Sequence, residues 1–309
     1  MSTLLIHHPS FLEHVTPIGH PERPDRIRAI DRILEHERFQ ALEREQAPVG
    51  TIEQAALAHP EAFVQEIKDA VPETGLTRID ADTVISPGSW KAAMRGVGGV
   101  CQAVDEVMAG KVKNAFCAIR PPGHHAEKDR AMGFCLFNNV AVAARWAKKQ
   151  HGVERVAIMD FDVHHGNGTQ DIFWSDTSVM YTSTHQMPLY PGTGAVNETG
   201  AGNTIVNAPL RAGDGGAEFR EAMEVAILPR IEDFRPDLVI ISAGFDAHHR
   251  DPLGQINLVE ADYAWVTAKL MDIADRSANG RVVSVLEGGY DLEGLAKSVA
   301  AHVMTLMKA

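Results

Sequence analysis

Polar, reactive side chains follow four short apolar segments that have the composition of buried β-strands. In an open α/β sheet the carboxyl ends of parallel strands lie along one edge, and ligands bind in the crevice beyond them. We therefore expect the four polar segments to converge at one site, which a random scatter of His and Asp would not do. The segments are 120–125 (RPPGHH), 160–165 (DFDVHH), 244–246 (GFD) and 287–290 (EGGY).

Three residues of these segments form a candidate metal site. Asp162 and His164 are two residues apart, so in extended backbone just past a strand their side chains point the same way. Asp246 follows another strand and supplies a third ligand, and three protein ligands leave a position open for water, as in catalytic zinc sites. Alone, the DxDxHH motif is explained equally well as a polar strand end with solvated side chains. The other strand ends favour the metal site.

Hydrolysis of an amide also needs groups that move protons, because the attacking water must lose one and the leaving amine must gain one. His124 and His125 form a tandem imidazole pair suited to both tasks, and Asp160 can orient one of them by accepting its ring N–H. The Tyr290 hydroxyl is a candidate donor to the oxyanion that forms when water attacks a carbonyl. Taken singly, adjacent histidines are more often surface or satisfied core residues, and Tyr290 could be an ordinary half-buried tyrosine.

The remaining sequence supplies the elements that must position these groups. Short apolar runs alternate with longer stretches of helical periodicity, the pattern of a parallel sheet with helices on both faces. The sequence thus predicts an α/β fold with one doubly wound, mostly parallel sheet. The expected strands are Leu4–Ile6, Ala115–Ile119, Val156–Met159, Val179–Thr182, Leu238–Ser242 and Val282–Leu286. The expected helices are Pro24–Glu37, Ser89–Met108 and stretches within 138–150, 217–232, 260–276 and 292–307.

Composition excludes several classes of protein. The chain has 309 residues, 45% hydrophobic and 23% charged, so intrinsic disorder is excluded and a large core can form. A formal net charge of −12 argues against nucleic-acid binding through phosphate contacts. No apolar run approaches the roughly 20 residues of a membrane helix.

Domain organisation and location follow from similar observations. With no linker to divide it, the chain is expected to form one catalytic domain over residues 1–309. The start has no leader pattern, so we expect a cytoplasmic protein without membrane contacts. Cys101, Cys117 and Cys135 are odd in number and widely spaced, which predicts neither a disulfide framework nor a thiolate zinc site.

Over nearly its whole length the sequence resembles members of the histone deacetylase superfamily, which have the arginase–deacetylase fold. So many motifs in the family's order make accident implausible. The resemblance implies a zinc-dependent hydrolase that removes acetyl or other acyl groups from lysine side-chain amines in proteins or peptides. The matching motifs are HPERPDR at 20–26, RPPGHHA at 120–126, GFCLFNN at 133–139, DFDVHHGNGTQ at 160–170, YPGTG at 190–194, SAGFDAH at 242–248 and EGGYDL at 287–292.

The same resemblance implies roles for individual residues. Zinc is the implied metal, although the ligand set would also accept Fe²⁺ or Co²⁺. His125 is expected to be the general base and acid, and Tyr290 to polarise the substrate carbonyl. The implied zinc ligands are Asp162, His164 and Asp246. The implied catalytic residues are His124, His125, Asp160, Asn167 and Tyr290.

In that family the acyl-lysine enters a narrow channel walled by two aromatic side chains. Here these would be Phe134 and Tyr190, and tyrosine in place of the more usual phenylalanine makes the wall more polar. Asn167 stands where the first class of the family has Asp and the second class has Asn, so the match is to class II. The uncharged amide would not favour a protonated His125 as a carboxylate would.

Few positions bear on the substrate. The polyamine-selective member of class II has a glutamate at the position of Leu253, which attracts a second cationic amine, so leucine favours an acyl-lysine peptide. Asp82 is either a rim residue that holds the backbone N–H groups of a peptide substrate or a plain loop aspartate. The resemblance also implies Gly133 and Gly288 as substrate-binding positions.

The family also carries structural monovalent cations, usually K⁺. A cation beside the metal ligands would stiffen the loop that holds two of them. One implied site uses main-chain oxygens of Asp160, Asp162 and His164 together with Ser183 and Thr184. A second uses the carbonyls of Phe173, Asp176 and Val179.

Three other functions compete with lysine deacylation. The main alternative is an acetylpolyamine amidohydrolase, because the resemblance extends to family members that hydrolyse acetylpolyamines, and the acidic chain is compatible with either basic substrate. A binuclear manganese ureohydrolase would need more carboxylates where this chain has His124 and His125. A silent module that binds acylated ligands would not need the full set of metal ligands, histidine pair and Tyr290. The sequence leaves open whether the chain forms a homo-oligomer.

Overall fold

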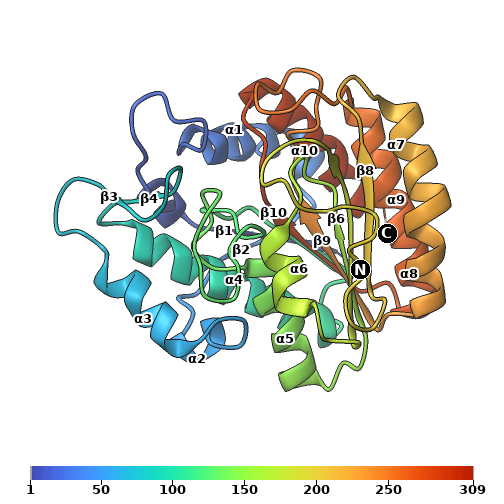
Figure 1. Cartoon of the computed structure of the whole chain (residues 1–309), viewed down its shortest axis with the longest axis horizontal. Coiled ribbons are helices and arrows are strands. Elements are labelled where there is room, and N and C mark those ends of the chain that lie inside the picture. The colour runs from blue at the N-terminus through green and yellow to red at the C-terminus, as the bar shows by residue number, and fades with distance from the viewer. Residues whose placement is uncertain (1, 309) are drawn as a thin grey trace.

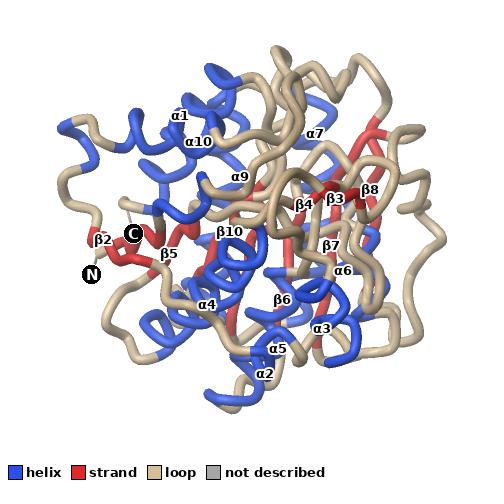
Figure 2. Tube along the Cα trace, turned by 90° about the vertical axis from the view of Figure 1, so that its left-hand side faces the viewer, coloured by secondary structure: helices blue, strands red, loops and turns tan. Residues whose placement is uncertain are grey.

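The computed structural model describes residues 2–308 and is built on one eight-stranded sheet. All neighbouring strands of this sheet run parallel, in the order β2-β1-β5-β10-β9-β6-β7-β8 (Figures 1 and 2). A small antiparallel pair, β3 (Thr77–Arg78) and β4 (Val84–Ile85), lies apart from it. The strands of the main sheet are β1 (Thr3–His7), β2 (Glu43–Gln46), β5 (Asn114–Cys117), β6 (Val156–Asp160), β7 (Val179–Gln186), β8 (Ile205–Leu210), β9 (Leu238–Ala243) and β10 (Val282–Leu286).

Helices cover both faces of the sheet, as the views in Figures 1 and 2 show. One face carries α4 and α5 with the short helices before and after them, and the other carries α1, α9 and α10 with α7 and α8. The helices are α1 (Asp25–Leu34), α2 (Ile52–Ala55), α3 (Glu61–Asp69), α4 (Ser89–Met108), α5 (Asn139–His151), α6 (Asn167–Phe173), α7 (Gly216–Ala222), α8 (Leu228–Phe234), α9 (Glu260–Ser277) and α10 (Leu292–Leu306). Single 3₁₀ turns form at Pro9–Leu12 and Glu37–Phe39.

The predicted α/β class and doubly wound sheet are confirmed, and all six predicted strands are present. The sequence did not reveal the short pair β3 and β4, and the two strands of the main sheet that it missed, β2 and β8, are the edges of that sheet. β2 reads EREQ and exposes all four side chains, so it lacks the apolar signal of a buried strand. β8 contains Pro209, which is tolerated at an edge because it has no N–H to donate.

Two predicted helices differ from the structure. The helix expected over 24–37 ends at Leu34, and a separate 3₁₀ turn follows. The helix expected within 217–232 is divided into α7, a π-helical turn over Met223–Ile227, and α8. Pro229 lies in the first turn of α8. Proline has no backbone N–H to donate, so it is tolerated in a first turn but would interrupt the interior of one continuous helix.

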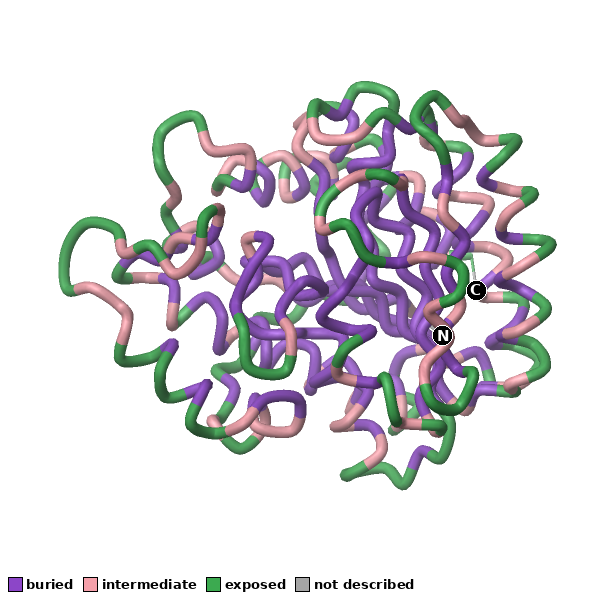
Figure 3. The backbone as a smooth tube through the Cα atoms, viewed as in Figure 1, coloured by how far each residue is buried: buried purple, intermediate pink, exposed green. Residues whose placement is uncertain are grey.

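The centre of the sheet is completely buried (Figure 3). Every residue of β5, β6, β9 and β10 is buried, which agrees with strands covered on both faces. These four strands are neighbours in the order β5-β10-β9-β6, and each leads into one of the four polar segments. The sheet therefore brings the four segments to one edge, as the sequence predicts. Within residues 2–308, no helix combines the length and the apolar character needed to cross a membrane.

Candidate active site

The loops after β6, β9 and β10 bring three potential metal ligands together. Asp162 and His164 follow β6 and Asp246 follows β9, and one ligand atom from each lies within 4.8 Å of the others. His164 Nδ1 is 3.1 Å from Asp162 Oδ1 and 3.1 Å from Asp246 Oδ2. All three residues are buried. The structure thus joins all three residues that the sequence singled out as a metal site.

Backbone amides fix the two carboxylates. Gly288 N–H donates to Asp162 Oδ2 over 2.8 Å, and Val163 N–H donates to Asp246 Oδ1 over 2.8 Å. A Cβ at Gly288 would stand 2.2 Å from Asp246 Oδ2, so only glycine allows this approach. Gly288, which the sequence predicts to bind substrate, therefore shapes the metal site in the structure.

The charges of this cluster favour a bound cation. Two carboxylates are buried side by side, which is costly unless a positive charge offsets them. Burial and the neighbouring Asp162 raise the pKa of Asp246 to about 7. Burial lowers the pKa of the His164 imidazole, but hydrogen bonds to the two carboxylates outweigh it and raise this pKa to about 10. One nitrogen and two oxygen ligands in a buried, acidic cluster fit a divalent transition metal.

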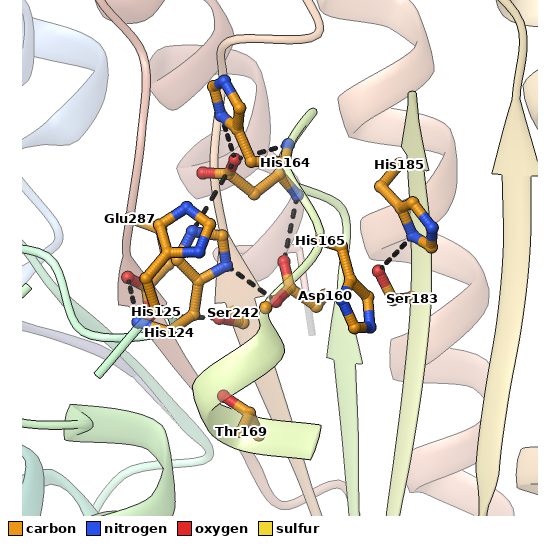
Figure 4. Close-up of polar contacts among 12 residues, drawn as sticks. His124, His125, Asp160, His164, His165, Thr169, Ser183, His185, Ser242 and Glu287 are labelled. Atoms are coloured by element: carbon orange, nitrogen blue, oxygen red, sulfur yellow. Dashed lines mark hydrogen bonds and ion pairs between the residues drawn. The ribbon is translucent and has the colours of Figure 1, made fainter. Parts of the chain in front are cut away.

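His124 is the histidine of the pair that contacts a carboxylate. Its Nδ1 lies 2.9 Å from Asp160 Oδ2, and its Nε2 lies 3.8 Å from the metal-site oxygen Asp162 Oδ1 (Figure 4). Tyr181 donates its hydroxyl to the same Asp160 oxygen over 3.0 Å. Although burial opposes a charge on His124, the negative charges of Asp160 and Asp162 raise its pKa well above the usual range.

His125 has a different environment. Its Nδ1 lies 2.8 Å from Asn167 Oδ1, so its partner is uncharged. Burial and the adjacent His124 lower the pKa of His125 well below its usual range. Gly133 (φ 57°) passes so close that a Cβ there would stand 2.4 Å from His125 Cδ2. The two histidines therefore have pKa values displaced in opposite directions, an arrangement that separates an acid from a base.

Tyr290 lies in the loop after β10. The Arg26 guanidinium lies 5.0 Å from the centre of its ring, and the ring of Phe134 meets it edge-on at 5.9 Å. Its backbone N–H donates to Asp251 Oδ2 over 2.6 Å. Burial raises the pKa of the Tyr290 phenol well above its usual range, so the hydroxyl keeps its proton.

The two aromatic residues predicted to wall a channel lie beside the histidines of the site and beside Tyr290. Tyr190 meets the ring of His125 at 5.1 Å and that of His164 at 6.3 Å, whereas Phe134 contacts Tyr290. Tyr190 is 38% exposed, so it reaches from the metal site to the surface. Phe134 has a positive φ of 67°, a conformation that non-glycine residues rarely adopt.

The loop of Asp82 is bonded to the Phe134 loop, and the loop of Leu253 is bonded to the Tyr290 loop. Asp82 Oδ1 accepts hydrogen bonds from Gly133 N–H (3.1 Å) and from the Thr83 hydroxyl (2.8 Å). Leu253 is half-buried, and its N–H donates to Asp251 Oδ1 over 3.0 Å. Because Asp251 also accepts from Tyr290, it ties the Leu253 loop to the tyrosine loop.

The residues predicted for two K⁺ sites lie in two separate regions. Ser183 and Thr184 are on β7, paired with the end of β6, and the buried Thr184 hydroxyl has no hydrogen-bond partner. Ser183 Oγ is 2.8 Å from His185 Nδ1. At the second site, the Asp176 carboxylate pairs with Arg145 over 2.6 Å, so only main-chain oxygens remain there for a cation. Those residues are Phe173, Asp176 and Val179.

Two supporting residues were not predicted as part of the site. Glu287 is buried and accepts from the N–H groups of Gly123 (2.7 Å) and His124 (3.1 Å), which fixes the histidine loop (Figure 4). Arg26 is also buried, and it donates to the carbonyls of Glu287 and Gly289 on either side of the turn before Tyr290. Both residues lie in recognised motifs, EGGY and HPERPDR, but nothing in the sequence shows which groups they contact.

Comparisons with known proteins give one consistent result. Residues 20–306 match a family model described as the histone deacetylase domain. The chain is 40% identical to a histone deacetylase-like amidohydrolase of Pseudomonas aeruginosa, over 88% of this chain and 73% of the relative. It is 39% identical to a probable deacetylase of Archaeoglobus fulgidus, over 95% of this chain and 83% of the relative. The crystal structure of the HDA15 HD domain superposes with a TM-score of 0.94 at 37% identity, over 99% of this chain and 88% of that one.

Proposed function

Because the chain belongs to the histone deacetylase family and is a hydrolase of amide bonds, we propose that it is a zinc-dependent deacylase of lysine side chains in peptides or proteins. The observation that carries the proposal is the buried Asp162, His164 and Asp246 cluster with the two histidines beside it. This arrangement favours one metal rather than two, because His124 and His125 occupy the place where a second metal would need carboxylates.

The residues of the chain divide the work of hydrolysis between them. Zinc bound by the cluster would polarise the substrate carbonyl and lower the pKa of a water molecule. His125, uncharged and held through Nδ1 by Asn167, takes a proton at Nε2 and later gives it to the leaving amine. His124, paired with Asp160, stays protonated and stabilises negative charge. Tyr290 donates its hydroxyl to the oxyanion.

The substrate assignment rests on the wall and rim of the proposed channel. Phe134 and Tyr190 would enclose an extended aliphatic chain, and Gly133 and Gly288 would let it approach. Leu253 offers no negative charge to the second amine of a polyamine. An acyl-lysine side chain has no second amine, so it does not need a charge at this position. Asp82 already accepts a hydrogen bond from Gly133 through Oδ1, which leaves its other oxygen for a substrate N–H.

We also propose that K⁺ stabilises the metal loop, using main-chain oxygens of Asp160, Asp162 and His164 with Ser183 and Thr184. The unpartnered Thr184 hydroxyl supports this site, since a buried polar atom without a partner is costly. The second K⁺ site, at the carbonyls of Phe173, Asp176 and Val179, has no comparable support. A cytoplasmic location likewise stays a prediction.

The substrate is tested by measuring kcat/KM on an acetyl-lysine peptide and on an acetylated polyamine side by side, for the native protein, Leu253→Glu and the neutral control Leu253→Met. We expect the native protein to prefer the peptide. Leu253→Glu should shift the ratio toward the polyamine by up to about fivefold, the effect of one partly exposed charge contact, and Leu253→Met should not. A preference of the native protein for the polyamine would overturn the lysine assignment. The same assays are repeated with a metal chelator, and turnover that the chelator does not reduce, or no turnover of either substrate, would overturn the proposed function.

A further inference from the structure

A hydrogen-bonded chain runs from His125 to a carboxylate on the rim of the site. Asn167 Oδ1 is 2.8 Å from His125 Nδ1, and Asn167 Nδ2 donates to Glu127 Oε1 over 2.7 Å. Asn167 is buried and Glu127 is half-buried. The histidine that we assign as the base is thus separated from a carboxylate by one amide.

The orientation of that amide decides which nitrogen of His125 carries the proton. If Asn167 presents its oxygen, Nδ1 must be the protonated nitrogen, which leaves Nε2 free to accept a proton. If the amide is turned around, its NH₂ group donates to Nδ1, and the ring proton must move to Nε2. In the second tautomer His125 cannot act as a base through Nε2.

Glu127 is the group that makes the two amide orientations unequal. A carboxylate can only accept hydrogen bonds, so it pairs with the NH₂ end of Asn167 and repels the oxygen end. The other neighbour of this NH₂ group is the Met132 thioether, 3.4 Å away, which is a weak acceptor. We propose that Glu127 is a positioning residue that fixes the orientation of Asn167 and thereby the tautomer of His125.

The local backbone holds Glu127 in place for this role. Its N–H donates to the Arg130 carbonyl over 2.9 Å, which closes a tight turn over 127–130. Lys128 N–H donates to Asp171 Oδ2 over 3.0 Å, which ties the turn to α6, the helix that begins at Asn167. Glu127 and Asn167 are therefore carried by two segments fixed to each other.

The expected effect of Glu127 on kcat rests on the proposed function. Its expected effect on the His125 tautomer does not. An aspartate at position 167 would have two equivalent oxygens and would need no orienting partner. With aspartate there, Glu127 would instead be a second negative charge beside the first. The effect of removing Glu127 should thus depend on residue 167, and a purely structural role for Glu127 would not produce this dependence.

The direct measurement is the tautomer of His125, read from long-range ¹H–¹⁵N NMR spectra of histidine-labelled protein at pH 8, with zinc and without it. In the native protein we expect the Nδ1–H form, and in Glu127→Gln, whose amide can pair with either end of Asn167, we expect a smaller fraction of that form. In Glu127→Ala we expect a large fraction of the Nε2–H form. Asp129→Ala, which removes an exposed carboxylate from the same turn, is the matched control and should match the native spectrum.

The kinetic measurement uses the same variants in two backgrounds. With Asn167 present, Glu127→Ala should lower kcat by about tenfold with little change in KM, the usual loss for one hydrogen bond to a charged group. With Asn167→Asp, the same substitution should leave kcat unchanged or raise it. An unaltered His125 tautomer in Glu127→Ala, or an equal loss of kcat in both backgrounds, would overturn the inference. If the native protein deacylates nothing, the proposed function fails, yet the NMR result still decides the role of Glu127.

Discussion

At the scale of single residues, the chemistry depends on two neighbouring histidines having different partners. His124 meets the carboxylate of Asp160, and His125 meets the amide of Asn167. The carboxylate favours a charged ring and the amide a neutral one, so His124 keeps its proton while His125 is free to accept a proton and return it. The sequence revealed both partners as candidates, because DFDVHHGN places them around the metal ligands.

Tyr290 gives the most direct test at this scale. Tyr290→Phe removes only the hydroxyl and keeps the ring contacts with Phe134 and Arg26. Loss of an oxyanion donor should lower kcat by roughly two to three orders of magnitude. The measurement is kcat on an acetyl-lysine peptide, together with the zinc content of each protein. Unchanged turnover at equal zinc content would remove Tyr290 from the mechanism.

At the scale of elements, the carboxyl ends of β5, β10, β9 and β6 form the site, and helices on both faces hold the loops in place. The sequence predicted these strands because they are apolar throughout, and it predicted their polar ends from residue type. It did not reveal the contact from α1 to the tyrosine loop. Arg26 and Glu287 are 261 residues apart, and no local pattern records such a pairing.

Arg26 tests whether α1 positions Tyr290. Its guanidinium makes two hydrogen bonds to carbonyls of the loop and stacks on the ring, and the single ammonium of a lysine cannot reproduce this geometry. Arg26→Lys should lower kcat by roughly ten- to hundredfold through misplacement of the hydroxyl, with zinc content unchanged. The matched control is Arg28→Lys on the exposed side of the same helix. Equal kcat values for both variants would show that Arg26 has no positioning role.

At the scale of the whole molecule, one parallel sheet forms the centre of the fold. The chain as a whole is acidic, with a formal net charge of −12. That charge favours the approach of basic substrates but identifies none of them. The interpretation of residues 1–309 as one catalytic domain stays a prediction, and it agrees with a single sheet that uses strands from both ends of the chain. The edge strand β2 escaped prediction because its four side chains are polar and exposed, and β8 because Asn207 and Pro209 interrupt its apolar run.

Global stability should depend on pH through His302, a buried histidine that is not part of the metal cluster. His302 is fully buried on α10, between the hydroxyls of Thr267 (2.6 Å) and Ser284 (2.8 Å), and burial lowers its pKa from 6.5 to about 3. The unfolded chain therefore binds this proton more readily, so the stabilisation is complete above pH 6.5 and is lost as the pH falls toward 3. Between pH 7 and pH 5 the loss should be about 2 kcal/mol.

Urea unfolding at pH 7 and pH 5 checks this prediction. The free energy of unfolding of His302→Gln should fall less between the two pH values than that of the native protein, by about 2 kcal/mol. His36→Gln, at an exposed site, is the control and should behave like the native protein. The same pH dependence in His302→Gln and the native protein would contradict the assignment.

The central claim is that Asp162, His164 and Asp246 hold one zinc ion on which amide hydrolysis depends. The measurement is the rate of acetate release from an acetyl-lysine peptide as zinc is added back to chelator-stripped protein, for the native chain and for Asp246→Asn. We expect the native rate to rise from baseline and to level off at one zinc per chain, while the variant stays near baseline. Full turnover by the stripped protein, or equal zinc-dependent rates in both proteins, would contradict the account.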